Sequence, residues 1–152
     1  MGKATPYQGV GEITFDMSLS EVLKYLHEKG LRYHLEKWPN KGCSPEVAWD
    51  IVRVGKDVSF FFARDRMFKI YFENGFSGSL VNGISLGMKI EEAETIDPTI
   101  RYDDWEEIYT SDLGYWLEDD VESGEIISIS IFIKELENDE VFFKYEWCDR
   151  RQ

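Results

Sequence analysis

One segment of this sequence occurs twice, which restricts the folds open to the chain. Residues 13–22 (ITFDMSLSEV) return 71 positions later as residues 84–93 (ISLGMKIEEA). Aligned without gaps, the copies match at four apolar positions and one glutamate: Ile13 and Ile84, Phe15 and Leu86, Met17 and Met88, Leu19 and Ile90, Glu21 and Glu92. Self-similarity of this kind indicates a repeated supersecondary unit. The sequence therefore predicts two versions of one unit, residues 1–76 and 77–152, within one compact domain.

The first copy opens a readable succession of elements. A short strand is predicted at 12–17, followed by a helix in which Ser18 and Glu21 form a capping box and which Gly30 ends. Beyond the helix, β-branched and aromatic runs separated by turn residues indicate strands. The expected segments are an extended stretch at 31–38, a loop at 39–45 and strands at 47–54, 58–63 and 68–72.

The second copy repeats this order with a shorter helix at 89–95. Lys89 replaces the capping Ser18, and Pro98 forces an early end because proline disfavours helix in the residue before it. Strands are expected at 81–86, 105–111, 113–118 and 125–133, with a last run at 141–147. That run is either the final core strand or an edge for dimerisation. The predicted fold class is α+β: two tandem β-α-β-β-β units forming an antiparallel sheet with helices on one face.

The charge of the chain is strongly unbalanced. Thirty acidic residues oppose seventeen basic ones, for a formal net charge of −13. Lys and Arg bind the phosphate backbone, so this balance argues against a nucleic-acid partner. An acidic surface steers a cationic protein toward it, although acidity also serves solubility. The favoured partner is a basic protein.

Targeting features and cysteine usage indicate a cytoplasmic protein. No apolar stretch approaches the roughly 20 residues of a membrane span, and residues 1–7 lack an apolar signal region. Cys43 and Cys148 lie far apart without a CxxC pairing, which favours reduced thiols over a disulfide or metal site. We expect a monomer or weak dimer without membrane association.

Signatures of familiar enzymes are absent from the sequence. It contains no GxGxxG, GxxxxGK, GxSxG or HExxH motif and no EF-hand loop. His27 and His34 stand on either side of Gly30 and need not face each other, so no metal site is expected. We expect a protein that is not an enzyme and has no cofactor. The many carboxylates leave two alternatives open: a small carboxylate-based hydrolase with a cleft between the units, or an assembly or adaptor protein.

The densest functional signal is an acidic and aromatic run at 102–125 that contains no Lys or Arg. Strand alternation places Trp105, Glu107 and Tyr109 on one face, and places Trp116 outward if Leu117 points to the core. Aromatic anchors among acids suit a protein-binding face, unless a helix covers it. Residues 58–62 (VSFFF) of the first unit align with residues 113–117 (LGYWL) of the second, which matches Phe61 to Trp116. The predicted partner-binding residues are Asp103, Asp104, Trp105, Glu107, Tyr109, Trp116, Glu118, Asp119, Asp120, Glu122 and Phe61.

The repeated segments also carry a resemblance. A unit with a strand and a Met before an acidic helix, then antiparallel strands, resembles the β-lactamase inhibitory protein fold and its relatives among outer-membrane assembly lipoproteins. The resemblance rests on residues 13–22 and 84–93 with the strand runs after each. It implies a curved sheet with helices on one side and a concave, aromatic-bearing face that grips another protein.

Small, acidic α+β chains without catalytic motifs also look like the immunity proteins of bacterial toxin systems, including contact-dependent inhibition. That likeness implies the task of occluding a cognate toxin, often a basic nuclease. The leading hypothesis is therefore an immunity protein, or antitoxin, that binds and neutralises a basic toxin domain. Its carboxylates would mimic phosphates and its aromatic side chains would act as anchors.

Overall fold

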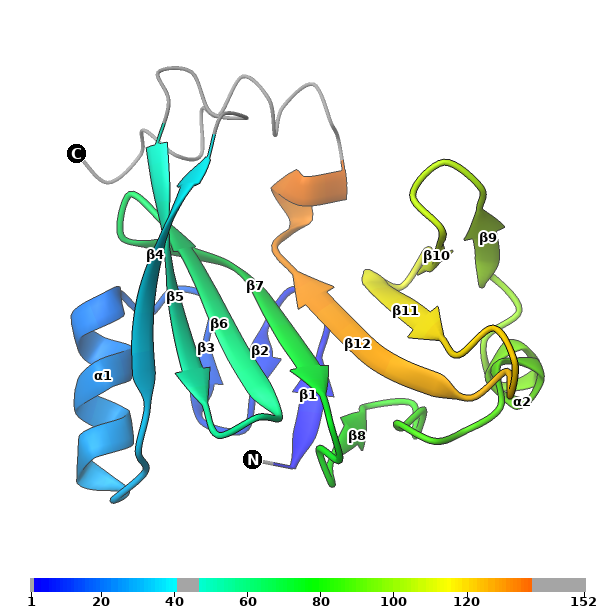
Figure 1. The fold of residues 1–152 in the computed structure, drawn as a ribbon, viewed down its shortest axis with the longest axis horizontal. Helices are drawn as coiled ribbons and strands as arrows, with labels where there is room; N and C mark the ends of the chain where they lie inside the picture. The colour runs from blue at the N-terminus through cyan, green and yellow to red at the C-terminus, as the bar shows by residue number, and fades with distance from the viewer. Residues whose placement is uncertain (1, 41–46, 138–152) are drawn as a thin grey trace.

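A computed structural model describes residues 2–40 and 47–137. The fold is mixed α+β and consists mainly of strands in two sheets (Figure 1). The larger sheet is antiparallel, with the strand order β4-β5-β6-β7-β12-β11-β10-β9. Its strands are β4 His34–Asn40, β5 Val47–Val54, β6 Val58–Ala63, β7 Arg66–Glu73, β9 Arg101–Asp103, β10 Ile108–Ser111, β11 Tyr115–Asp119 and β12 Ile126–Phe132. The predicted α+β class with an antiparallel sheet is confirmed, while its division into two tandem units stays a prediction.

A second, four-stranded sheet joins the N-terminal residues to the middle of the chain. It has the order β3-β2-β1-β8, and β1 runs parallel to β8. The strands are β1 Lys3–Thr5, β2 Gly9–Val10, β3 Ile13–Thr14 and β8 Ser79–Leu80. The predicted strand at 81–86 is wrong, because the chain turns after Leu80, with the amide of Gly83 donating to the Leu80 carbonyl at 2.9 Å. Strands β1, β2, β8 and β9 have no counterpart in the sequence prediction.

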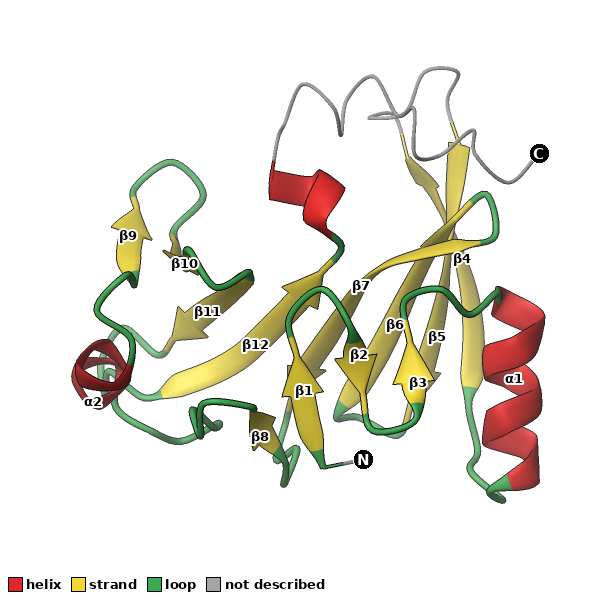
Figure 2. Ribbon diagram, turned by 180° about the vertical axis from the view of Figure 1, so that it is seen from behind, coloured by secondary structure: helices red, strands yellow, loops and turns green. Residues whose placement is uncertain are grey.

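Both helices occur where the sequence predicts them. α1 spans Leu19–Glu28, and both hydrogen bonds of the Ser18–Glu21 capping box are present. α2 spans Ile90–Ile96 and has no side-chain cap at Lys89. Figure 2 shows α1 and the small sheet on the same side of the large sheet. The amide of Ile90 donates to the Gly124 carbonyl, which attaches the start of α2 to the turn between β11 and β12.

Strand alternation divides the large sheet into two faces. The covered face, beneath α1 and the small sheet, is apolar: Phe60 pairs with Ile70, Ile70 with Ile131, and each is fully buried. Val22 and Leu26 of α1 belong to the same buried cluster. We call the opposite side the outer face, and among the described elements only the 3₁₀ helix η1 (Lys134–Glu137) lies at its margin (Figure 1).

The covered side also contains a buried carboxylate, that of Asp97. Asp97 caps the end of α2 and is 3% exposed. It accepts hydrogen bonds from the Thr99 amide at 3.0 Å, the Thr99 hydroxyl at 2.6 Å, the Ser111 hydroxyl at 2.5 Å and the hydroxyl of Tyr115. Burial acts to raise the pKa of Asp97, but hydrogen bonds from Ser111, Thr99 and Tyr115 outweigh it and lower the pKa. Asp97 therefore stays ionised inside the protein.

Several predicted boundaries differ from the observed ones. β10 begins at Ile108 rather than at 105, and β11 begins at Tyr115, leaving Leu113 half exposed in a turn. β4 continues through Asn40, into the segment expected to be a loop. The predicted strand at 141–147, together with Cys43 and Cys148, lies outside the described residues.

Candidate functional site

Cross-strand register identifies the residues of the outer face. Lys69 of β7 lies opposite Phe61 on one side and opposite Phe132 on the other. Further along the strands, Ser130 lies between Tyr71 and Trp116. Directly paired residues point to the same side of a sheet. Phe61 and Trp116 therefore share the outer face, as the sequence repeat predicts.

Two of the predicted acidic residues join them there. Glu118 pairs with Ser128, two positions from Ser130, and so points to the outer face. Its carboxylate accepts hydrogen bonds from the Ser128 hydroxyl at 2.6 Å and the Tyr71 hydroxyl at 3.2 Å. Asp103 pairs with Ile108, on the same side as Thr110 and Trp116. The outer face thus combines aromatic rings with carboxylates.

Tyr109 does not belong to this group, so its predicted placement with Trp116 is wrong. Tyr109 pairs with Leu117, a buried residue of the covered side, and its ring contacts Tyr102 with 5.0 Å between centroids. The alternation expected from Trp105 to Tyr109 fails because these residues do not form one strand. Glu107 has φ = +57° in the turn between β9 and β10, and the strand begins only after it.

The remaining predicted acids lie in two turns. Asp104 stands with Trp105 and Glu107 in the β9–β10 turn, where the Trp105 side chain is 91% exposed. Asp120 and Glu122 lie in the β11–β12 turn, and Asp120 accepts hydrogen bonds from the Glu122 and Ser123 amides at 2.9 and 3.2 Å. Asp119 precedes that turn, at the end of β11 away from Trp116. The structure separates these acids from the centre of the outer face.

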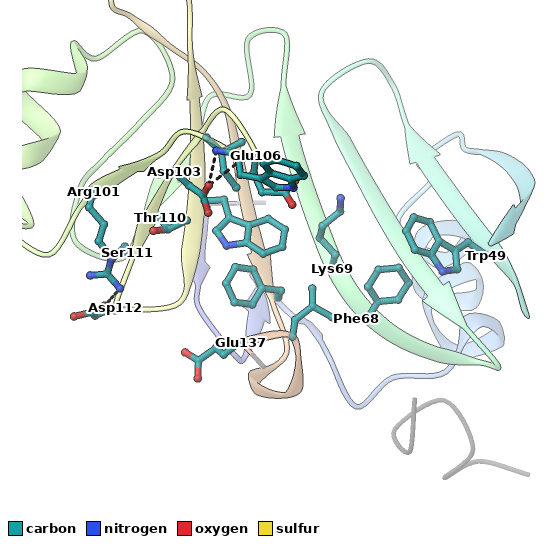
Figure 3. Close-up of a pocket in the computed structure, with 15 residues that line it drawn as sticks. Trp49, Phe68, Lys69, Arg101, Asp103, Glu106, Thr110, Ser111, Asp112 and Glu137 are labelled. Carbon is teal, nitrogen blue, oxygen red and sulfur yellow. Dashed lines mark hydrogen bonds and ion pairs between the residues drawn. The ribbon is translucent and has the colours of Figure 1, made fainter. Parts of the chain in front are cut away.

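The outer face contains a pocket of about 760 Å³ between the two halves of the large sheet (Figure 3). β5 and β7 supply Trp49, Phe68 and Lys69 on one side. β9 to β12 and the β9–β10 turn supply the other side, including Asp103, Trp105, Glu106, Trp116 and Phe132. η1 contributes Leu136 and Glu137 at the margin. We call this cavity the outer-face pocket.

Two aromatic walls line the outer-face pocket. Trp116 packs against Phe132 with ring centroids 4.5 Å apart and planes inclined by 38°. Across the pocket, Trp49 packs against Phe68 at 4.9 Å, and Phe61 meets the Trp49 ring edge-on at 6.1 Å. The buried Nε1–H of Trp49 has no hydrogen-bond acceptor among the described residues. Such walls provide apolar contact area for a flat group.

Lys69 stands between the walls, and sequence reasoning missed it. Its Nζ lies 4.4 Å from the ring centroid of Phe61 and 5.8 Å from that of Tyr71. Burial lowers the pKa of Lys69 to about 8, although the negative charge of Glu118 acts in the opposite direction. Within residues 2–40 and 47–137, its ammonium group makes no hydrogen bond and no ion pair. Alternation of Lys69 with apolar neighbours gave only the ordinary signal of a solvent-facing strand residue.

The charged residues at the rim of the pocket have structural contacts. Arg101 pairs with Asp112 at 2.8 Å. Asp103 accepts hydrogen bonds from the amides of Trp105 and Glu106 at 2.9 and 3.1 Å, which fixes the turn that carries Trp105. At the other edge of the outer face, Arg53 pairs with Glu36 at 3.0 Å. The outer face is therefore of mixed charge rather than uniformly acidic.

Side chains able to ligate a metal ion are dispersed over the described residues. There, no three His, Cys, Asp or Glu side chains form a group able to hold a metal ion. His34 lies 3.7 Å from Glu36 on β4, whereas His27 is on α1. Neither described helix has the length and apolar character needed to cross a membrane. Comparison with protein-family models, with curated proteins and with solved structures gave no match.

Proposed function

We propose that this protein is an immunity-type inhibitor that binds a basic toxin domain, in particular a nuclease, through the outer face. The observation that carries the proposal is that Trp105, Trp116 and the rim acids line one pocket on the outer face. Exposed aromatic residues supply contact area at interface hot spots, and acids around them steer a cationic partner. The net charge of −13 supports the same choice of partner.

We also propose the two-unit organisation, on which the likeness to tandem-repeat inhibitors rests. Each helix is followed by four strands, β4 to β7 and β9 to β12, and the last strands of the two sets pair at the middle of the sheet. Residues 69–72 (KIYF) of the first unit align with residues 128–131 (SISI) of the second, which matches Tyr71 to Ser130, and these two residues lie directly opposite each other. A pseudo-two-fold axis between β7 and β12 accounts for that coincidence.

We expect a basic toxin domain to be encoded next to this gene, and the test uses that domain. We expect a stoichiometric complex and protection of cells that express the toxin. Trp116→Ala and Glu106→Arg should each weaken binding by about 2 kcal/mol or more. Glu91→Arg is the matched control, because Glu91 is exposed on α2 and undergoes the same change of charge. Binding that survives both outer-face substitutions would rule out this surface.

A small hydrolase is the second candidate, because the outer-face pocket lies between the two halves of the sheet and is lined by carboxylates. Acid–base catalysis needs two carboxyl groups free to act on a substrate. Asp103 and Asp112 are instead engaged by backbone amides and by Arg101. These contacts favour binding over catalysis. An adaptor role would differ from inhibition by stable binding to several partners.

A further inference from the structure

Lys69 is unusual because its partly buried ammonium group makes no hydrogen bond and no ion pair with the described residues. Most buried ammonium groups are paired with a carboxylate or hydrogen-bonded, since removal from water is costly. The ammonium of Lys69 has ring contacts with Phe61 and Tyr71, and it makes no hydrogen bond or ion pair to the rest of the described chain. Figure 3 shows it between the side of the pocket that carries Trp49 and the side that carries Asp103. A bound anion would complete its coordination.

The two aromatic walls of the pocket indicate the shape of the ligand that carries this anionic group. Trp116 with Phe132 and Trp49 with Phe68 form two aromatic pairs that line the same cavity as Lys69. A cavity of about 760 Å³ lies within the size range of small-molecule pockets. Aromatic walls with one ammonium group between them favour a flat, apolar ligand that is oriented by one polar end.

The charged residues at the rim of the pocket restrict the charge that a ligand can carry. Asp103, Glu106 and Glu137 line the pocket, while Arg101 is neutralised by its ion pair with Asp112. A phosphate or another multiply charged anion would approach these carboxylates with strong repulsion. A group with one negative charge satisfies Lys69 at the least cost.

We propose that the outer-face pocket binds an aromatic monocarboxylate, with its ring between the aromatic walls and its carboxylate on Nζ of Lys69. The inference does not rest on the proposed function, because a small carboxylate is bound or not bound whatever macromolecule the outer face recognises. A toxin complex that fails to form would leave it intact, and absence of carboxylate binding would leave the inhibitor proposal intact.

The test is calorimetric titration of the full chain with 2-naphthoate, its neutral analogue 2-naphthamide and 2-naphthyl phosphate at pH 7. We expect 2-naphthoate to bind with a Kd below about 1 mM and the other two to bind at least about tenfold more weakly. Lys69→Met should reduce the affinity for 2-naphthoate to that for 2-naphthamide, while Lys69→Arg should retain the preference for the anion. Trp116→Ala should weaken both ligands alike.

Lys29→Met is the matched control, because Lys29 also lies over a ring, that of Tyr25 at 5.6 Å, but belongs to the α1 region. This variant should bind 2-naphthoate as the unaltered protein does. Circular dichroism establishes that each variant is folded. The proposal is overturned if the folded protein binds neither 2-naphthoate nor benzoate, if it binds acid and amide equally, or if the phosphate binds more tightly than the carboxylate.

Discussion

Each side of the large sheet contains a charged side chain away from bulk water, but only the one on the covered side has hydrogen-bond partners among the described residues. On the covered side, Asp97 accepts hydrogen bonds from Thr99, Ser111 and Tyr115. On the outer face, Lys69 is partly buried beside the rings of Phe61 and Tyr71 and makes no hydrogen bond to any described residue. A charge with a complete set of partners is part of the fold, whereas a charge without them marks a place where a second molecule can supply what is missing.

The shifts in pKa show the same difference between Asp97 and Lys69. Hydrogen bonds lower the pKa of Asp97 in spite of its burial, so folding favours the charged carboxylate. Burial lowers the pKa of Lys69 to about 8, so folding disfavours the charged ammonium. Burial and the hydrogen bond to Asp97 also raise the pKa of Tyr115 to about 12, which keeps that hydroxyl protonated as a donor. Asp97 should therefore stabilise the fold and Lys69 should weaken it.

The largest expected effect is the loss of the Asp97 network. Asp97→Ala removes the acceptor for Ser111 and Tyr115 and leaves their hydroxyl groups buried. We expect the free energy of unfolding to fall by about 3 to 4 kcal/mol, measured by urea denaturation at pH 7. Asp112→Ala is the control, because it breaks an exposed ion pair with Arg101 and should cost less than about 1 kcal/mol. Equal losses in the two variants would contradict a special role for the network.

Lys69→Met should act in the opposite direction. Replacing the partly buried ammonium by an apolar side chain of similar length should raise the free energy of unfolding by about 2 kcal/mol at pH 7. Since the pKa is about 8 in the folded state and higher in the unfolded state, the unaltered protein gains stability as pH rises from 8 toward 10. The advantage of the variant should shrink over that interval. A destabilised Lys69→Met protein would show that the ammonium has a stabilising partner.

Local sequence signals made part of the fold and of the candidate site predictable. The Ser18–Glu21 capping box fixes the start of α1, and the apolar runs of β5 and β6 fix two core strands. The pairing of β1 with β8 was not predictable, because parallel strands distant in sequence share no local pattern. Nor was the placement of Tyr109, since the positive φ of Glu107 interrupts strand alternation. Lys69 was missed because the lack of a hydrogen-bond or ion-pair partner among the described residues is a property of the packed structure alone.

A smaller effect is expected on acid stability. A carboxylate whose pKa is lowered by folding contributes stability that is complete above its unfolded-state pKa of about 3.9. This contribution is lost as pH falls through the lower, folded-state pKa of Asp97. The difference in unfolding free energy between the unaltered protein and Asp97→Asn should therefore decrease on acidification from pH 6. A difference that stays constant with pH would show that the Asp97 pKa is unchanged by folding.

The smallest expected effect on the free energy of unfolding is that of Trp105→Ala, which distinguishes a residue available for binding from one that also stabilises the fold. Trp105 is 91% exposed at the tip of the β9–β10 turn, whereas Trp116 is half-buried against Phe132. Trp105→Ala should change the free energy of unfolding by less than about 0.5 kcal/mol, because it removes almost no packed area. Trp116→Ala should cost more, since it opens a gap beside Phe132. Thermal unfolding of both variants measures this difference in stability. If Trp105→Ala were as unstable as Trp116→Ala, the Trp105 side chain would have to pack against the protein in solution. A stable Trp105→Ala protein is also the cleanest reagent for the toxin-binding assay, because any loss of affinity it shows comes from the missing ring.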